Sequence, residues 1–418
     1  THAINLVTVQ PKPGEIVVTV AGSKRQAVSL WELWSRRELN RNVAGVNTSF
    51  LLGLQEINGA LLYLNLGAEF GGLSSHEPHS LVAGATGSGK SVLIQALILD
   101  IAATNPKELA QLILIDPKQV EMAQYARLPH LLTPPVTNPK KAANALGWAV
   151  KEMERRYDLL VEVGYRDIGG YNQAFDRGEV VQEREGFPPY ERLPFIVVVV
   201  DELNDLMMVA ARDVEESITR IAQKALAVGI HLIVATQRPS VNVITGVIKA
   251  NIPARMAFAV SSLTDSRVIL DQPGAEKLVG KGDMLLLPGN TNVPQRIQGS
   301  WVDEEEVRQV VAHWRNQSPE VAYVSGIEGD ADGGGGQPGL FGGSTGNDGD
   351  DGMLRQAIEI VVRSGLGSTS LLQRKLKVGF ARAGRLMDEL EERGIVGPSE
   401  GSKPRAVLMS VEELDAMG

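Results

Sequence analysis

Residues 84–91 read Gly84-Ala85-Thr86-Gly87-Ser88-Gly89-Lys90-Ser91, a complete phosphate-binding loop of the GxxxxGK[ST] type. The apolar run 80–83 precedes this loop and a run of helical character follows it, so a strand and a helix enclose it. The three glycines allow successive backbone N–H groups to surround a polyphosphate, and the N-terminus of the helix adds its dipole. Lys90 is placed to reach the β- and γ-phosphates, and the Ser91 hydroxyl is placed to ligate Mg²⁺. The sequence therefore predicts a nucleoside triphosphate site.

Outward from this loop, strands alternate with helices from about residue 78 to 325. The predicted strands are 80–83, 111–115, 195–200, 230–235 and 255–260, and the predicted helices are 91–103, 138–161 and 212–228. Strands that are apolar throughout and separated by helices indicate a parallel sheet covered on both faces. The fold class predicted for this region is therefore α/β.

A second motif of nucleotide hydrolases follows the strand 195–200, which ends in Asp201-Glu202. Asp201 is placed to hold the water shell of Mg²⁺, and Glu202 to polarise the attacking water. Gln237 follows the strand 230–235 and is placed to sense the γ-phosphate, because the ends of parallel strands converge on the ligand. The predicted catalytic set is Lys90, Asp201, Glu202 and Gln237, with Ser91 and Asp201 on the metal. The alternatives are a helix N-cap for the acidic pair and an ordinary turn for Gln237.

Asp116-Pro117-Lys118 closes the strand 111–115 at the same sheet edge. Two interpretations stay open with equal weight: these residues contribute to the site, or Pro117 merely ends the strand in a turn. His76 and His79 have HxxH spacing, but the loop around them offers no further ligand, so we expect no metal there.

The ends of the chain differ from this nucleotide region. Residues 1–75 hold a predicted strand at 16–20, a helix at 28–39 and a hairpin turning at Asn58-Gly59. They are predicted to form a small α+β accessory domain before the nucleotide-binding domain at 76–327. Residues 328–352 contain 11 glycines and 6 acidic residues, which predicts a flexible linker. A separate domain is expected at 353–418, where residues 354–405 carry a net charge of +4.

The composition of the chain restricts which other kinds of site it can hold. The formal net charge of −9 means that any nucleic-acid site must be local, and the absence of cysteine excludes disulfides and thiol nucleophiles. No apolar run approaches the ~20 residues that span a bilayer, so we expect no membrane contact from this segment. The chain begins with Thr1, which leaves open a longer polypeptide with an upstream membrane anchor.

The chain resembles the FtsK/SpoIIIE family of double-stranded DNA translocases over essentially its whole length. The likeness rests on stretches in family order: Leu81 into the loop at 84–91, 142–157, Gly229-Ile230-His231 to Ser240, 244–253, 265–271 and Gly282-Asp283-Met284-Leu285. It implies a RecA-like motor domain, a linker and a C-terminal winged-helix domain, called γ in the family. It also implies a hexameric ring of identical subunits around duplex DNA, with ATP and Mg²⁺ bound between subunits.

A site between subunits needs a cation from the neighbour to stabilise phosphoryl charge. The candidates are Arg220, Arg238, Arg255 and Arg267, and the sequence does not choose among them. The family often has a further arginine where this chain has Leu226, which removes one contact of this kind.

Two regions are predicted to contact DNA. Lys249 lies in a segment rich in hydroxyl and amide groups that suits a pore loop; the alternative is a surface hairpin with a solvated lysine. In the winged helix, Arg382 and Arg385 lie near the start of the expected recognition helix, and Lys403 lies in the wing between the strands 394–396 and 406–408. Ala381 and Asp388 depart from residues that the family often has there, which leaves the DNA sequence preference open. A protein-binding winged helix is the alternative.

These observations predict an ATP hydrolase that translocates duplex DNA, acting in chromosome segregation at cell division. Recombination or division proteins are expected partners of the γ domain, and the segment itself is expected in the cytoplasm, with an inner-membrane anchor upstream left open. Two alternatives remain. A conjugation or secretion ATPase is disfavoured by the basic tethered domain, and a nucleotide-gated scaffold is disfavoured by Glu202, which a pure switch does not need.

Overall fold

The computed structural model describes most of the chain as two compact units, residues 1–340 and 341–418. The described residues are 5–12, 14–21, 27–37, 39, 45–67, 77–182, 189–329, 349–376, 380–398, 405–410 and 414. No helix in these ranges is both long and apolar enough to cross a membrane.

The larger unit is built on a nine-stranded mixed sheet with the order β4-β3-β11-β10-β9-β5-β8-β7-β6. Strands β9, β5, β8, β7 and β6 are parallel, as predicted, and carry the nucleotide motifs. Antiparallel strands β10, β11, β3 and β4 extend the sheet on one side. The bounds are β3 Ser49–Gln55, β4 Leu61–Asn65, β5 His79–Ala83, β6 Ala110–Ile115, β7 Phe195–Val200, β8 Ile230–Thr236, β9 Ala254–Phe258, β10 Asp283–Leu287 and β11 Gln295–Gly299.

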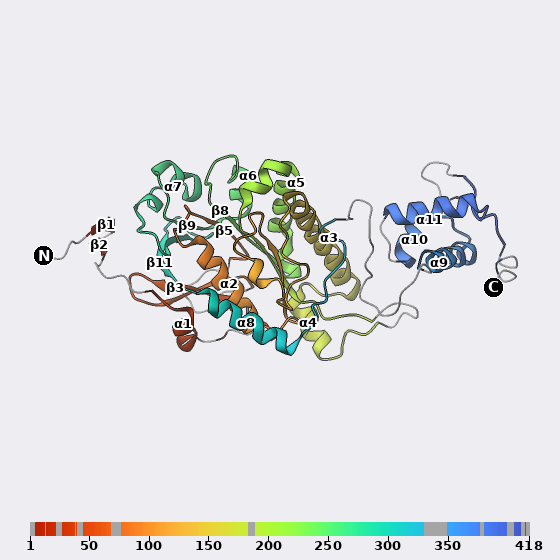
Figure 1. Cartoon of the computed structure of the whole chain (residues 1–418), viewed down its shortest axis with the longest axis horizontal. Coiled ribbons are helices and arrows are strands. Elements are labelled where there is room, and N and C mark those ends of the chain that lie inside the picture. Colours follow the sequence, from red (N-terminus) through yellow and green to blue (C-terminus); the bar gives the residue numbers. More distant parts are fainter. Residues whose placement is uncertain are drawn as a thin grey trace. The chain divides into compact units, whose positions relative to one another are not determined.

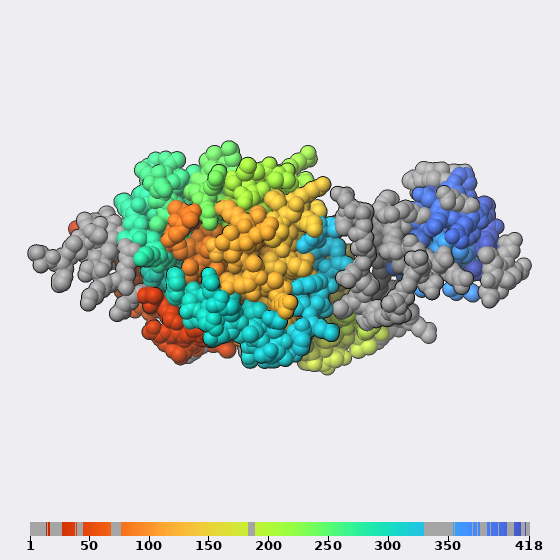
Figure 2. Space-filling model, in the orientation of Figure 1, coloured from red at the N-terminus to blue at the C-terminus, as the bar shows by residue number. Residues whose placement is uncertain are grey.

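Helices cover both faces of the sheet (Figure 1). One apolar cluster joins the sheet to α3 (Pro139–Val163), α5 (Leu203–Lys224) and α6 (Gly246–Asn251). A second cluster on the other face joins it to α1 (Leu30–Arg36), α2 (Lys90–Thr104) and α8 (Glu304–Gln317). Figure 2 shows α1 (red) and α8 (cyan) side by side on the surface. The remaining elements of this unit are α4 (Ile168–Asp176), α7 (Leu263–Leu270), the hairpin β1 (Asn5–Lys12) and β2 (Glu15–Ala21), and the short 3₁₀ turns η1 (Ala123–Tyr125), η2 (Ala225–Val228) and η3 (Ala275–Lys277).

The N-terminal segment shares the sheet of the nucleotide strands. β3 and β4 form the predicted hairpin, with Gly59 at φ +65°, but β3 also pairs with β11. β3 also contacts α2, because Asp100 of α2 accepts a hydrogen bond from the Leu51 backbone N–H of β3 at 2.7 Å. Asp100 forms an ion pair with Arg37 as well. The predicted accessory region at 1–75 and the predicted motor region at 76–327 therefore meet in one core, although these boundaries themselves stay predictions.

Two helices differ in extent from their predictions. The helix expected at 28–39 is shorter, because α1 spans only Leu30–Arg36. The helix expected from residue 212 begins nine residues earlier, at Leu203, and has a kink at Ala210. Glu202 explains the early start, because its side chain caps the helix by accepting from the Asn204 backbone N–H at 3.2 Å.

The smaller unit contains three helices in its described part: α9 (Gly349–Ser364), α10 (Thr369–Leu376) and α11 (Phe380–Glu392). Their apolar side chains form one core that includes Leu386, Met387 and Leu390, the predicted stripe of α11. An isolated bridge joins Val396 to Val407, within the two predicted wing strands, and a second bridge joins Gly367 to Arg405, outside them. Most of the predicted linker, and Lys403, lie outside the described residues.

Candidate functional site

The loop 84–91 has the backbone that a phosphate-binding loop requires, between β5 and α2. Gly87 and Gly89 adopt φ of +77° and +111°, which side chains disfavour. A Cβ on Gly89 would lie 2.4 Å from the backbone N of Gly282, so this position admits only glycine. Gly282 in turn donates its N–H to the Ser88 carbonyl at 2.9 Å. The loop is therefore held from its far side by the turn before β10.

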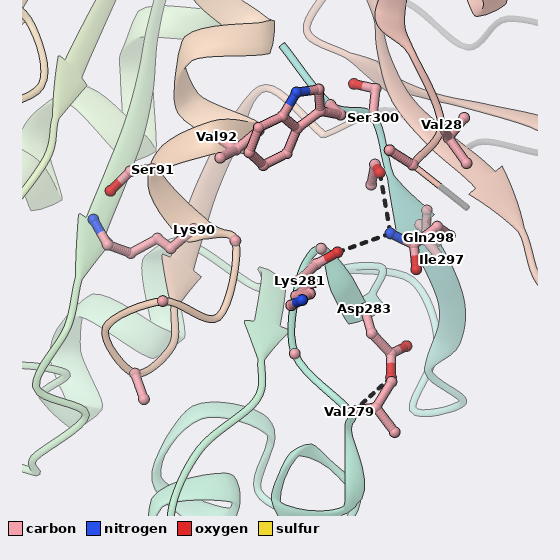
Figure 3. Close-up of a pocket in the computed structure, with 18 of the residues that line it drawn as sticks. Val28, Lys90, Ser91, Val92, Val279, Lys281, Asp283, Ile297, Gln298 and Ser300 are labelled. Carbon is pink, nitrogen blue, oxygen red and sulfur yellow. Dashed lines mark hydrogen bonds between the residues drawn. The ribbon is translucent and has the colours of Figure 1, made fainter. Parts of the chain in front are cut away.

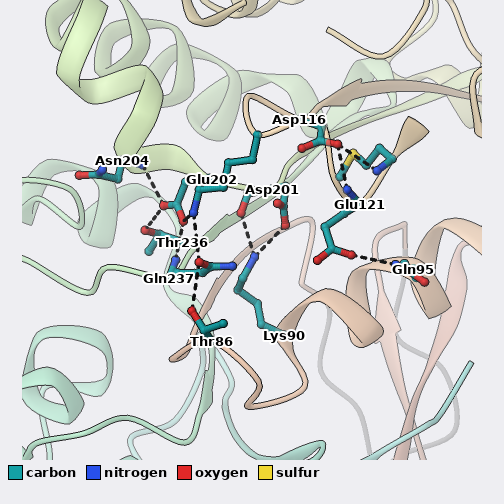
Figure 4. Close-up of polar contacts among 12 residues, drawn as sticks. Thr86, Lys90, Gln95, Asp116, Glu121, Asp201, Glu202, Asn204, Thr236 and Gln237 are labelled. Carbon is teal, nitrogen blue, oxygen red and sulfur yellow. Dashed lines mark hydrogen bonds and ion pairs between the residues drawn. The ribbon is translucent and has the colours of Figure 1, made fainter. Parts of the chain in front are cut away.

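Lys90 and Asp201 form an ion pair at the centre of the site (Figure 4). The Lys90 Nζ lies 2.7 Å from Asp201 Oδ1 and 2.9 Å from the Asp201 carbonyl oxygen. Both side chains are only 2% exposed. These two contacts hold the ammonium group of Lys90 at the carboxyl end of β7.

Glu202 is surrounded by hydrogen-bond donors (Figure 4). Its Oε1 accepts from the Thr236 hydroxyl at 2.6 Å and from the Asn204 backbone N–H, and its Oε2 accepts from the Gln237 backbone N–H at 3.0 Å. The fourth donor is Lys118, whose Nζ lies 3.5 Å from Oε2. These donors fix the direction of the Glu202 side chain, and Lys118 is the most distant of them.

Gln237 connects the loop to the strand end. Its Oε1 accepts from the Thr86 hydroxyl at 3.3 Å and from Lys118 Nζ at 3.1 Å. Both interpretations of residues 116–118 therefore hold in part. Lys118 reaches the site, whereas Asp116 shapes the turn by accepting from the backbone N–H groups of Glu121 and Met122 at 3.1 and 3.0 Å.

A cavity of about 770 Å³ opens beside these residues (Figure 3). Its size suits a nucleotide, since ligand pockets measure about 300–1,000 Å³. Lys90 and Ser91 lie on one side of it, and Val28 and Gln298 on the opposite side. The cavity thus extends from the phosphate loop to a wall built by residues far away in sequence.

Sequence reasoning missed that wall. It consists of Val28, the turn 279–282, and the end of β11 with Ser300 and Trp301. Lys281 lines it at φ +54°, between two glycines that also have positive φ. The pattern Gly-Lys-Gly at 280–282 was the available signal for the turn; Ser300 and Trp301 offered none.

The donor set at this site suits Mg²⁺ bound together with phosphates. Mg²⁺ favours one or two protein oxygens and takes the rest from phosphates and waters. Ser91 lines the cavity, and the Asp201 carboxylate lies at Lys90. Among the described residues, no three or more His, Asp or Glu side chains gather into a metal site of protein ligands alone. His79 instead accepts from the Leu232 backbone N–H at 3.1 Å, and His76 lies outside the described residues.

The four candidate arginines differ in environment. Arg255 is mostly buried and bonds the Ile269 carbonyl at 3.0 Å and Asp271, and Arg220 pairs with Glu154. Arg238, directly after Gln237, and Arg267, on α7, are exposed and have no side-chain ion pair with any residue that the structure describes.

The predicted DNA-contacting residues are placed as follows. Lys249 on α6 pairs with Asp271 at 2.7 Å. Partial burial would raise the pKa of Asp271, but hydrogen bonds from Lys249 and Arg255 hold that pKa below its usual value. Lys249 is therefore tied to the same carboxylate as Arg255. Arg382 and Arg385 lie in the first half of α11, where they were predicted.

Comparison with known proteins adds the following. The model of the FtsK/SpoIIIE family matches residues 68–241, and the model of the Ftsk gamma domain matches residues 348–410. A protein of Tropheryma whipplei named DNA translocase FtsK is 54% identical over 340 residues, covering 81% of this chain and 44% of its own length. A protein of the same name from Corynebacterium glutamicum is 46% identical over 419 residues, covering 100% of this chain and 43% of its own length. The chain thus spans less than half the length of these curated relatives.

Two solved structures share the fold. The conjugation coupling protein TcpA of pCW3, solved with ATPγS, has a TM-score of 0.55 at 22% identity, covering 74% of this chain and 82% of that one. The cytoplasmic domain of the type VII secretion ATPase EccC from Thermomonospora curvata has a TM-score of 0.57 at 24% identity, covering 69% and 34%. At such identities the likeness concerns the fold alone.

Proposed function

The chain belongs to the FtsK/SpoIIIE family, and on that premise we propose that it is an ATP-hydrolysing motor that translocates double-stranded DNA. The observation that carries this proposal is the assembly of Lys90, Asp201, Glu202 and Gln237 around one phosphate-binding loop. Two relatives that are 54% and 46% identical to this chain over the aligned residues are named DNA translocases, and their name indicates the task proposed here.

Each residue of the site has a role in ATP hydrolysis that follows from its position. Lys90, already fixed at the strand end, contacts the β- and γ-phosphates, and the loop N–H groups hold the phosphate oxygens. Ser91 and Asp201 would hold Mg²⁺, which neutralises phosphate charge when bound. Glu202 takes the proton of the attacking water. Gln237 senses the γ-phosphate, and its side chain is hydrogen-bonded to Thr86 and Lys118.

We infer that the site is completed by a second copy of the chain in a ring, in keeping with the family's hexamers. Arg238 and Arg267 support this proposal, because both are exposed cations with no partner in the described part of the chain. Arg255 and Arg220 are the weaker candidates, since each is engaged within its own subunit.

Duplex DNA is the proposed substrate for translocation, with Lys249 in the ring and Arg382, Arg385 and Lys403 in the γ domain as its contacts. The match to a γ-domain model favours this function over a secretion or conjugation ATPase. Chromosome segregation at division is the proposed setting. Recombination or division proteins are proposed partners of the γ domain, and anchoring of the whole protein through a region before this segment is part of the same proposal.

The direct test compares ATP hydrolysis with and without linear duplex DNA. We expect duplex to stimulate hydrolysis severalfold and Lys90→Ala to abolish it, while γ-domain binding to DNA persists in that variant. Hydrolysis that is indifferent to duplex would overturn the motor function and leave an ATPase with another task.

A further inference from the structure

One carboxylate, that of Asp271, bonds both Lys249 on α6 and Arg255 on β9. Its Oδ1 lies 2.7 Å from Lys249 Nζ, and its Oδ2 lies 2.5 Å from Arg255 Nη1. Lys249 is the residue of the larger unit for which a contact with DNA is proposed. Its ammonium group is thus bonded to an acid of its own subunit, and any phosphate that binds Lys249 has to compete with Asp271.

The local backbone gives no reason for an acid at position 271. Asp271 ends α7 with φ +58°, a conformation that residues other than glycine rarely adopt. Its backbone N–H caps the helix by donating to the Arg267 carbonyl at 2.9 Å. A negative charge is unfavourable at the C-terminus of a helix, and glycine or asparagine would cap α7 without that charge. The carboxylate is therefore explained by the cations that it binds.

The helix that carries Lys249 is held from its other side by α5. The Thr245 hydroxyl donates to Glu215 Oε1 at 2.5 Å, and the Gln223 side-chain amide donates to Asn251 Oδ1 at 2.9 Å. These bonds fix both ends of α6 on α5, which lies next to it in Figure 1. A lysine has a flexible four-carbon stem, so Lys249 can change its acceptor by side-chain rotation while α6 stays in place.

The two cations differ in how firmly they are held. Arg255 is only 12% exposed, and its Nη1 also donates to the Ile269 carbonyl at 3.0 Å. The Asp271 side chain is 57% exposed, so water and phosphate can reach its pair with Lys249. Ion pairs open to water are weak, and a phosphate can displace this one at little cost. Arg255 remains as the partner of Asp271 when Lys249 leaves.

We propose that Asp271 competes with the phosphates of duplex DNA for the Lys249 ammonium group and takes that group back after each contact. The competition keeps the contact weak, and a motor needs weak contacts because it has to leave one phosphate before it reaches the next. This inference rests on the proposed translocation of duplex DNA and adds a residue that regulates the contact.

The test compares Asp271→Asn with the unaltered whole chain at one fixed ionic strength. Asparagine also tolerates positive φ, so the substitution keeps the cap of α7 and removes only the charge. Duplex binding, measured by fluorescence anisotropy, should become about two- to fivefold tighter, the range expected for one exposed ion pair. Triplex displacement at saturating ATP should slow by up to about the same factor, because release of each phosphate becomes harder.

Two further variants show whether the gain comes from Lys249. In the double variant, Lys249→Ala should remove the gain in affinity that Asp271→Asn produces. Asp265→Asn is the matched control, since it removes the same charge from α7, and Asp265 has no ion pair in the part of the chain that the structure describes. We expect its duplex affinity to equal that of the unaltered chain within about 1.5-fold.

Damage to the fold weakens binding, so a gain in affinity cannot arise from misfolding. Unchanged or weaker duplex binding in Asp271→Asn would overturn the proposal. A gain that persists without Lys249, or that Asp265→Asn reproduces, would also overturn it, because overall charge would then be the cause. Tighter binding that depends on Lys249, in a chain whose hydrolysis ignores duplex, would support the competition and refute the motor function.

Discussion

Lys118→Met tests whether the lysine at the end of β6 positions the hydrolytic groups. The substitution keeps the aliphatic stem and removes the ammonium group, which bonds Gln237 Oε1 at 3.1 Å and Glu202 Oε2 at 3.5 Å. Lys118 is 41% exposed, so its ion pair with Glu202 contributes at most about 1 kcal/mol. Glu202 keeps its three other donors, so the carboxylate stays in place.

A loss of about 1 kcal/mol corresponds to about a fivefold fall in kcat. KM for ATP should stay within about twofold, because Lys118 does not line the cavity. Glu202→Gln, which removes the base itself, should lower kcat by about 10²–10⁴-fold. The assay is steady-state ATP hydrolysis with saturating duplex DNA.

The matched control is Lys141→Met, which removes an exposed lysine that pairs with Glu328 at 2.8 Å away from the site. We expect kcat of this variant to equal that of the unaltered chain. The reasoning is refuted if Lys118→Met also leaves kcat unchanged, since Lys118 would then only end a turn. A loss as large as that of Glu202→Gln would refute the magnitude argued from exposure.

Three further results are expected. In hydrolysis assays, Arg238→Ala or Arg267→Ala should lower kcat about 10³–10⁵-fold, as loss of a trans arginine does. Arg220→Ala should change kcat less than about twofold, and a loss of kcat in Arg220→Ala alone would contradict the assignment. Deleting 353–418 should weaken duplex binding in a filter or anisotropy assay and preserve basal hydrolysis, and unchanged binding would remove the γ-domain role. Burial raises the pKa of Asp100 to about 6 from 3.8. The stabilisation by Asp100 is therefore complete below pH 4, and the free energy of unfolding declines by on the order of 3 kcal/mol as pH rises through 6. Urea unfolding at several pH values should show that Asp100→Asn removes this pH dependence, and an unchanged pH dependence would contradict the assignment.

Local sequence signals predicted the parts of the site whose function depends on residues close in sequence. The loop 84–91 carries its glycines, lysine and serine in one run, and Asp201-Glu202 follows directly on the buried strand that positions it. These motifs, and the presence of parallel strands between helices, follow from periodicity and spacing alone.

The parts that could not be predicted depend on contacts between distant segments. Trp301 enters the cavity because β11 pairs between β10 and β3, and nothing in residues 295–301 indicates that pairing. The extension of the sheet by β3 and β4 could not be predicted for the same reason. The residues of a hairpin turn do not show which other strand the hairpin pairs with. The role of Lys118 could not be predicted, because the sequence of a turn does not show whether its lysine faces solvent or contacts a glutamate.

The central claim is that hydrolysis at Glu202 moves the chain along duplex DNA, and displacement of a third strand from a triplex tests it most directly. The account predicts that the unaltered chain strips the third strand at a rate that depends on ATP. It also predicts that Glu202→Gln, which leaves the phosphate loop and the DNA-contacting residues in place, strips none above background. Duplex-stimulated hydrolysis without any displacement, or displacement undiminished in Glu202→Gln, would contradict it.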